Sequence, residues 1–161
     1  MKRLAISLAL LAAVAGLAAW WLSDTQVLKR RTHSLLTTLT IDSGNGKVGR
    51  QMGAYALNSL LAEQIELANP TLQEADGSFE RSELEAAYSW LCNQCKETLF
   101  ELRKIHSITV NGTDGNVSLT LVGLVELPTY RPVDGTFDVM LDWKKHEDGW
   151  RLTRATWKPV P

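Results

Sequence analysis

Asp138 and Asp142 are two carboxylates on one face of a predicted strand that runs from Phe137 to Trp143. Such a pair could do general acid–base chemistry inside a cavity, because neighbouring carboxylates push their pKa values apart. Side chains alternate between the two faces of a strand, and the other face of this one is apolar at positions 137, 139, 141 and 143. We therefore expect the apolar face to lie in the core and both acids to be solvated.

Arg154 is a charged residue that strand alternation directs towards the core. The sequence Asp148-Gly149 predicts a two-residue turn into a last strand over 150–157. In that register Arg154 shares the apolar face of the sheet. It would then bind an anionic ligand in the interior, near Tyr88 or His106, or it would pair with an acid at the end of the sheet. Local pairing is the simpler interpretation.

Cys92 and Cys95 form a Cys-x-x-Cys pair near the C-terminal end of a predicted helix. Redox pairs of this kind lie at a helix N-terminus, where a thiolate is stabilised, and a zinc site would need further ligands. The pattern favours two thiols over a local disulfide. The three histidines are scattered, and His106 lies where strand alternation slips, which indicates a bulge and a solvent-facing ring. The sequence predicts no catalytic residue, metal ligand or cofactor.

Helices and a long sheet must position these residues. Hydrophobic periodicity predicts a first helix that begins at Ser23 or Asp24, which would cap it. Glycine-containing turns near 111–115, 134–135 and 148–149 predict an antiparallel meander. The other expected elements are helices over 48–60 and from Ser78 to Cys95, a short strand over 64–69, and long strands over 97–110, 117–127, 137–143 and 150–157. This order is α+β.

Leu4 to Leu22 is an apolar run without a charged residue. A helix of that length rises about 28 Å, close to the hydrocarbon thickness of a bilayer. Lys2 and Arg3 precede the run, and the pair Trp20-Trp21 lies where indole rings favour the membrane interface. The pattern predicts that residues 4–22 attach the chain to a membrane as a single transmembrane helix.

The same run also fits a cleaved signal peptide, with Ala13-Val14-Ala15 as the cleavage site. Cleavage would leave an apolar tail on a soluble exported protein, so a retained signal anchor over residues 1–22 is the favoured interpretation. The basic residues 29–31 oppose Lys2 and Arg3 in the charge balance that sets orientation. Because a basic start before an apolar run is typical of an export signal, we expect domain 23–161 to be periplasmic or otherwise extracytoplasmic.

The charge of the chain excludes one class of partner. The 17 basic and 18 acidic side chains give a net charge of −1. Nucleic-acid binding would need a basic face. A hydrophobic content of 45% is that of a folded domain rather than a disordered chain.

The element order resembles the nuclear transport factor 2-like (SnoaL-like) superfamily over roughly residues 24–157. The resemblance is carried by the order of helices and strands and by the aromatic residues Phe137, Trp143, Trp150 and Trp157 in the closing strands. It implies three N-terminal helices packed on a curved antiparallel sheet, which together form a cone. The superfamily includes isomerases, dehydratases and non-catalytic assembly domains, so the fold does not choose among them.

Two functions follow from these observations. The favoured one is a non-catalytic binding or assembly module. The resemblance to one-span scaffold subunits of secretion machines implies a homodimer or a protein partner on the open face of the sheet, where Met140 and Trp157 are the candidate contacts. The alternative is an enzyme or carrier, of isomerase, cyclase or hydrolase type, that binds a small molecule inside the cone. Its candidate ligand-binding residues are Tyr88, His106, Leu119, Phe137, Leu141 and Arg154, with Trp90 as a further lining residue.

Overall fold

The structure is a computed structural model that describes residues 14, 16–42, 44, 47–68, 76–128 and 131–160. Most of the expected anchor, residues 1–13 and 15, lies outside the described residues. Among the residues that the structure does describe, no helix combines the length and apolar character needed to cross a bilayer.

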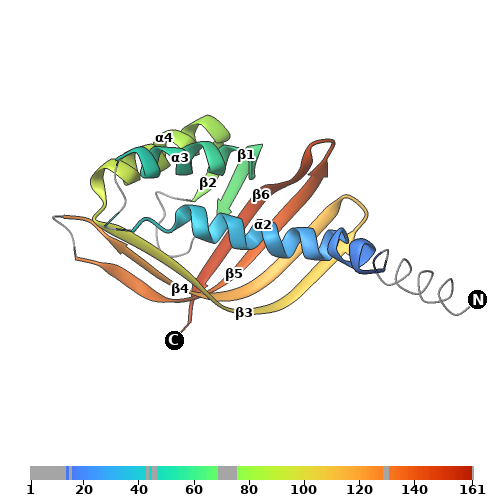
Figure 1. Cartoon of the computed structure of the whole chain (residues 1–161). Coiled ribbons are helices and arrows are strands. Elements are labelled where there is room, and N and C mark those ends of the chain that lie inside the picture. The colour runs from blue at the N-terminus through green and yellow to red at the C-terminus, as the bar shows by residue number, and fades with distance from the viewer. Residues whose placement is uncertain are drawn as a thin grey trace, which may run out of the picture.

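The α+β order is confirmed, with helices gathered on one side of a curved sheet (Figure 1). The sheet has six strands in the order β2-β1-β6-β5-β4-β3. It is mixed rather than wholly antiparallel, because β1 pairs with β6 in parallel. The elements are α2 (Asp24–Leu39), α3 (Lys47–Asn58), β1 (Leu61–Ala68), β2 (Gly77–Glu80), α4 (Arg81–Gln94), β3 (Glu97–Asn111), β4 (Asp114–Glu126), β5 (Val133–His146) and β6 (Gly149–Pro159).

Helix α2 lies along the concave face of the sheet because its buried residues share one stripe. Leu28, Thr32, Leu35 and Leu36 recur at helical spacing, and all four are buried. Ser23 occupies the N-cap position, as expected, but its hydroxyl donates back to the carbonyl of Trp20 at 2.7 Å. The stripe places the whole length of α2 against the sheet.

The expected start of the third helix at Ser78 is wrong. Residues 77–80 form β2, which pairs antiparallel with β1. Helix α4 begins at Arg81 with a reciprocal cap, in which the Glu80 backbone N–H donates to Glu83 Oε2 at 2.8 Å and the Glu80 carboxylate accepts from the backbone of Glu83. The carboxylate of Glu80 replaces the serine hydroxyl that usually marks such a start.

The strand pairs β3–β4, β4–β5 and β5–β6 form the predicted antiparallel meander. The predicted turn at 134–135 is wrong, because Asp134 and Gly135 lie inside β5 opposite Leu124 and Gly123. The connection between β4 and β5 covers residues 127–132 instead, of which 129–130 lie outside the described residues.

The C-terminal end of α2 is fastened to β3 by Thr98. This buried hydroxyl donates to the carbonyl of Leu39 at 2.6 Å and accepts from the backbone N–H of Ile41 at 2.9 Å. The carbonyls at the end of a helix lack partners within the helix, so Thr98 satisfies one of them. The contact holds the helix against the rim of the sheet.

Candidate functional site

The interior of the cone is filled by side chains of α2 and of the concave face of the sheet. Trp143 and Trp150 are each 1% exposed, and Leu28 is fully buried. A Cβ atom at Gly115 would lie 2.6 Å from Leu28 Cδ1 and 2.9 Å from Trp150 Cζ3, which shows how closely α2 approaches β4 and β6. The remaining core residues of this face are Leu35, Leu36, Val117, Leu119, Leu121, Val139, Leu141 and Leu152. The described core is therefore lined mainly by apolar groups, together with two buried polar atoms, Thr32 Oγ1 and Trp143 Nε1, that have no hydrogen-bond partner among the described residues.

Four of the six candidate ligand-binding residues belong to this core. Leu119, Leu141 and Tyr88 are buried, and Phe137 packs against the buried cluster. The Tyr88 hydroxyl donates to the carbonyl of Thr38 at 2.5 Å, so it satisfies a carbonyl in the last turn of α2. Burial, followed by a hydrogen bond with Cys92, raises the pKa of the Tyr88 phenol. The tyrosine is a neutral structural bridge between α4 and α2.

Arg154 lies on the outer face, so its predicted inward position is wrong. The register of β5 and β6 shifts between Asp142 and Trp143, which leaves Thr153 as an extra residue in β6. The bulge reverses the alternation of side chains. Arg154 lies opposite Asp142 in the strand register, and its guanidinium lies 3.5 Å from the carboxylate of Glu66. Local pairing, the simpler of the two interpretations, is the one observed.

The same bulge corrects the position of Trp157. It lies opposite Val139 and packs against the core, so it is not on the open face of the sheet. Met140, the other candidate contact, does lie on the open face and is 49% exposed. Trp90 is 58% exposed on α4, so it does not line the interior of the cone.

His106 also faces outwards, next to a register shift in β3, as strand alternation predicted. Its Nε2 atom lies 2.7 Å from Thr120 Oγ1, and the Thr120 hydroxyl donates to Asp138. Because Asp138 accepts the one hydroxyl proton of Thr120, the His106 Nε2–H donates to the threonine oxygen. Asp142 accepts from Asn116 Nδ2 at 2.6 Å on the same face. Both acids are therefore outside the core, where we expected them.

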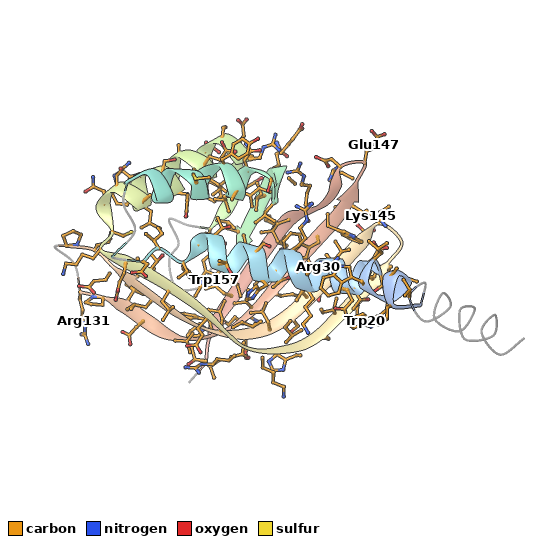
Figure 2. All side chains as sticks on the ribbon, viewed as in Figure 1. Trp20, Arg30, Arg131, Lys145, Glu147 and Trp157 are labelled. Carbon is orange, nitrogen blue, oxygen red and sulfur yellow. The ribbon has the colours of Figure 1, made fainter. Side chains whose placement is uncertain are left out.

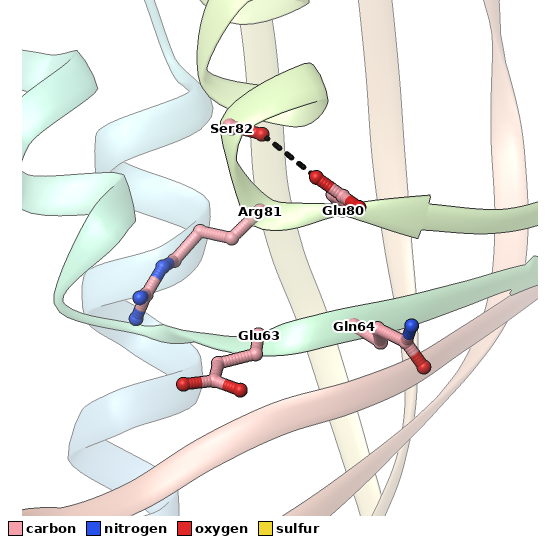
Figure 3. Close-up of a pocket in the computed structure, with 5 residues that line it drawn as sticks. All are labelled: Glu63, Gln64, Glu80, Arg81 and Ser82. Carbon is pink, nitrogen blue, oxygen red and sulfur yellow. Dashed lines mark hydrogen bonds between the residues drawn. The ribbon is translucent and has the colours of Figure 1, made fainter.

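The described residues form surface hollows on the helix side of the molecule. The first, of about 350 Å³, is at the start of α4 (Figure 3). It is lined by Glu63, Gln64, Glu80, Arg81 and Ser82. The Ser82 hydroxyl donates to Glu80 at 3.4 Å, and Glu80 also takes part in the helix cap, so these groups serve the local structure.

The second hollow, of about 680 Å³, lies between α2 and α3. Arg31 Nη1 donates to the carbonyl of Ser59 and Arg151 Nη1 to that of Asn58, each at 2.9 Å. Burial and the nearby Arg151 lower the pKa of Arg31, and Asp148 opposes that shift. Cations are favourable at a helix C-terminus, so both arginines stabilise the end of α3. The hollow is lined by Arg31, His33, Ser34, Thr37, Thr38, Ala56, Ser59 and Leu60.

Cys92 and Cys95 are buried, each 4% exposed, and both are thiols. Cys92 is the last buried residue of α4, and Cys95 forms its C-cap. Within the described part of the chain, no three side chains from histidine, cysteine, aspartate and glutamate gather as metal ligands would.

Asp24 joins the start of α2 to the sheet. The sequence indicates only that it could cap the helix and does not predict these contacts. Its carboxylate accepts from Lys145 Nζ at 2.7 and 2.9 Å and from Trp150 Nε1 at 3.1 Å. The Lys145 hydrogen bond, followed by that from Trp150, lowers the pKa of Asp24 from its ordinary value of 3.8.

Asp24→Asn is expected to lower stability at neutral pH and to matter less in acid. A carboxyl group whose pKa is lowered by folding stabilises the fold above its unfolded pKa, and this contribution is lost as pH falls through the folded pKa. The stability difference between wild type and Asp24→Asn should therefore shrink as the pH falls below about 3.8. Urea unfolding at a series of pH values measures it. When Lys145 is already replaced by Gln, Asp24→Asn should cause a smaller loss of stability at neutral pH. An equal loss with and without Lys145 would contradict the assignment of the lowered Asp24 pKa to Lys145.

Comparison with known proteins finds neither a matching protein family nor a curated protein of similar sequence. Solved structures do match. A nuclear transport factor 2-like superfamily protein from Salmonella enterica superposes with a TM-score of 0.65 at 12% identity, covering 86% of this chain and 92% of that one.

Two further structures give the same result. A nuclear transport factor 2-like protein from Cytophaga hutchinsonii has a TM-score of 0.61 at 17% identity, over 86% of this chain and all of that one (100%). A protein from Streptomyces avermitilis, named as a candidate dehydratase of this family, has a TM-score of 0.63 at 16% identity, over 86% and 96% of the two chains. At such identities the likeness establishes the fold alone, and this chain has the nuclear transport factor 2-like fold.

Proposed function

We propose that this chain is a non-catalytic binding or assembly domain, held at a membrane by its N-terminal segment and exposed to the exported compartment. The observation that carries the proposal is the filled cone. Enzymes that bind a small molecule need a concave site with a few convergent polar groups. Here the concave side is occupied by Leu28, Trp143, Trp150 and their apolar neighbours. Among the candidates, His106 and Arg154 lie outside, and the buried Tyr88 hydroxyl is taken up by the carbonyl of Thr38.

The open face of the sheet is the surface proposed for self-association. The helices cover the concave side, which leaves the other side of β3, β4, β5 and β6 uncovered (Figure 1). Met140 lies in the interior strand β5 between Ser118 of β4 and Thr156 of β6. Met140 is an exposed apolar side chain with small neighbours on the adjoining strands and with Asp138 and Asp142 on either side of it along β5, and we propose that it contacts a second copy related by a two-fold axis.

Membrane attachment is supported by the segment that leads into α2. Leu17, Trp20, Trp21 and Leu22 are between 55% and 70% exposed. Large apolar side chains in such a row are unfavourable in water. They continue the apolar sequence that begins at Leu4. A bilayer would remove them from water and would place the tryptophan pair at its interface.

Native mass measurement on the full chain in detergent tests the assembly proposal. The wild type is expected to be a dimer, and Met140→Glu is expected to be a monomer, because it places a charge at the centre of the contact. The matched control is Met52→Glu, since Met52 is 71% exposed on α3, away from the sheet face. A wild type that is monomeric at all concentrations, or a dimer that only Met52→Glu separates, would overturn the sheet-face proposal.

A further inference from the structure

One end of the molecule combines exposed indole rings with basic side chains. Trp20 and Trp21 are each 55% exposed at the N-terminal end of α2, with ring centroids 6.3 Å apart. Figure 2 shows Trp20, Lys145 and Glu147 towards this end of the domain and Arg131 towards the other. The tip of the β5–β6 hairpin, residues 146–149, therefore lies on the same side as the tryptophans.

The tryptophan pair is held to the domain by Arg30. Arg30 Nη1 donates to the carbonyl of Trp21 at 2.9 Å, and its guanidinium lies 4.6 Å from the centroid of the Trp21 ring. The Ser23 hydroxyl donates to the carbonyl of Trp20 at 2.7 Å. A cation stacked on an indole is an arrangement suited to the headgroup region, where both side chains keep one polar edge. Lys29 is exposed beside it.

This end is also fixed to the β5–β6 hairpin, which is in turn bonded to the β3–β4 turn. Lys145 bridges to Asp24, and its backbone N–H donates to the carbonyl of Thr113 in the β3–β4 turn at 2.8 Å. Trp150, which is 1% exposed, completes the joint through its hydrogen bond to Asp24. Because the start of α2 is bound to the β5–β6 hairpin, which is itself joined to the β3–β4 turn, the helix and the sheet have one relative orientation here.

The charges of this end are mixed but leave basic groups available. Asp24 is paired with Lys145, and Asp148 is paired with Arg151. Arg31 points inwards to the end of α3. The basic side chains that remain at the surface are Lys29, Arg30 and Lys144. The acidic side chains that remain at the surface of this end are Asp114 and Glu147. Arg30 is turned towards Trp21 rather than towards a carboxylate.

We propose that this end is a membrane rim, made of Trp20, Trp21, Lys29 and Arg30, that binds the phosphates of anionic phospholipids and brings the hairpin tip 146–149, on the same side, close to the membrane surface. The inference rests on the proposed membrane attachment and adds to it a fixed orientation of the domain relative to the bilayer. The tryptophans insert into the membrane interface, and the basic side chains bind the lipid phosphates. The contacts of Asp24 with Lys145 and Trp150 then fix the orientation of the sheet relative to the membrane. Each basic residue near an anionic surface favours docking by about five-fold.

The test uses the full chain with Glu147→Cys carrying an environment-sensitive nitrobenzoxadiazole label; the native thiols are each 4% exposed. The chain is reconstituted in vesicles of phosphatidylcholine, or of an equimolar mixture with phosphatidylglycerol. Quenching by neutral acrylamide is expected to be weaker in the anionic vesicles, because docking brings the label close to the membrane surface. The difference should disappear at about 1 M salt, where the Debye length is about 3 Å. Lys29→Gln and Arg30→Gln should each lower the ratio of docked to undocked domain about five-fold.

Arg131→Gln is the matched control, because it removes a surface charge at the other end and should leave quenching unchanged. Flotation of the vesicles after carbonate washing reports attachment separately. A chain that floats but is quenched equally in both lipids overturns the rim and leaves the anchor standing. A chain that does not float overturns both proposals.

Discussion

Replacing Trp150 by alanine is expected to lower the free energy of unfolding by about 3–5 kcal/mol, a large part of the stability of a domain. Trp150 is 1% exposed, packs beside Gly115, and donates its indole N–H to Asp24. Truncation would leave a cavity between α2 and the sheet and would remove a partner of a carboxylate. Urea unfolding of the full chain in detergent, followed by circular dichroism, measures the loss.

The control for this prediction is Trp90→Ala on α4. Trp90 is 58% exposed, so its truncation should change stability by no more than about 0.5 kcal/mol. If Trp150→Ala costs less than about 1 kcal/mol, the described packing of α2 against β6 is not what holds the domain together.

Gly115→Val is expected to destabilise the domain by about 1–3 kcal/mol, although valine normally favours a strand. Any Cβ at this position would lie 2.6 Å from Leu28 Cδ1 and 2.9 Å from a carbon of the Trp150 ring. Both neighbours are buried and cannot move aside without shifting α2. The midpoint of urea unfolding reports the change.

A double-mutant cycle shows whether the contact with Leu28 is the cause. Leu28→Ala alone creates a cavity and is expected to cost about 2–5 kcal/mol. In the combined variant the valine would occupy part of that cavity, so the total loss should be smaller than the sum of the two. Strict additivity would contradict the close approach at Gly115.

Local patterns in the sequence predict much of this architecture. The apolar side chains at 137, 139, 141 and 143 indicate the core face of β5, and the periodicity of Leu28 and Leu35 indicates the buried stripe of α2. Both signals are local, because a strand or helix with one buried face must repeat with its own period. The order of the elements then indicates the fold.

The bulge in β6 explains the misplaced residues Arg154 and Trp157. Its signal is present in the sequence, since apolar side chains occupy 150 and 152 but then 155 and 157, a change from even to odd positions. Thr153 takes the extra place, and its hydroxyl donates to the carbonyl of Asp142 at 3.1 Å. No glycine marks the site, so only this change of parity reveals it.

Contacts between distant segments had no comparable signal. Thr98 binds Leu39 and Ile41 across nearly sixty residues of chain, and Asp24 meets Lys145 and Trp150 only when the sheet closes on α2. Their side chains are of common types for a strand and a helix start. Such pairings follow from the register of the whole sheet, which short-range periodicity does not determine.

The measurement that most directly tests the filled cone is the unfolding free energy of Thr32→Val. Thr32 is fully buried on α2, and its hydroxyl has no hydrogen-bond partner among the described atoms. In a dry apolar core, an isosteric methyl group in place of that hydroxyl should raise stability by up to about 1 kcal/mol, because a buried polar group without a partner is costly. The control Thr98→Val removes two hydrogen bonds and should lower stability by about 1–3 kcal/mol. A similar loss for Thr32→Val would contradict the account, since it would mean that the Thr32 hydroxyl has a polar partner inside the cone.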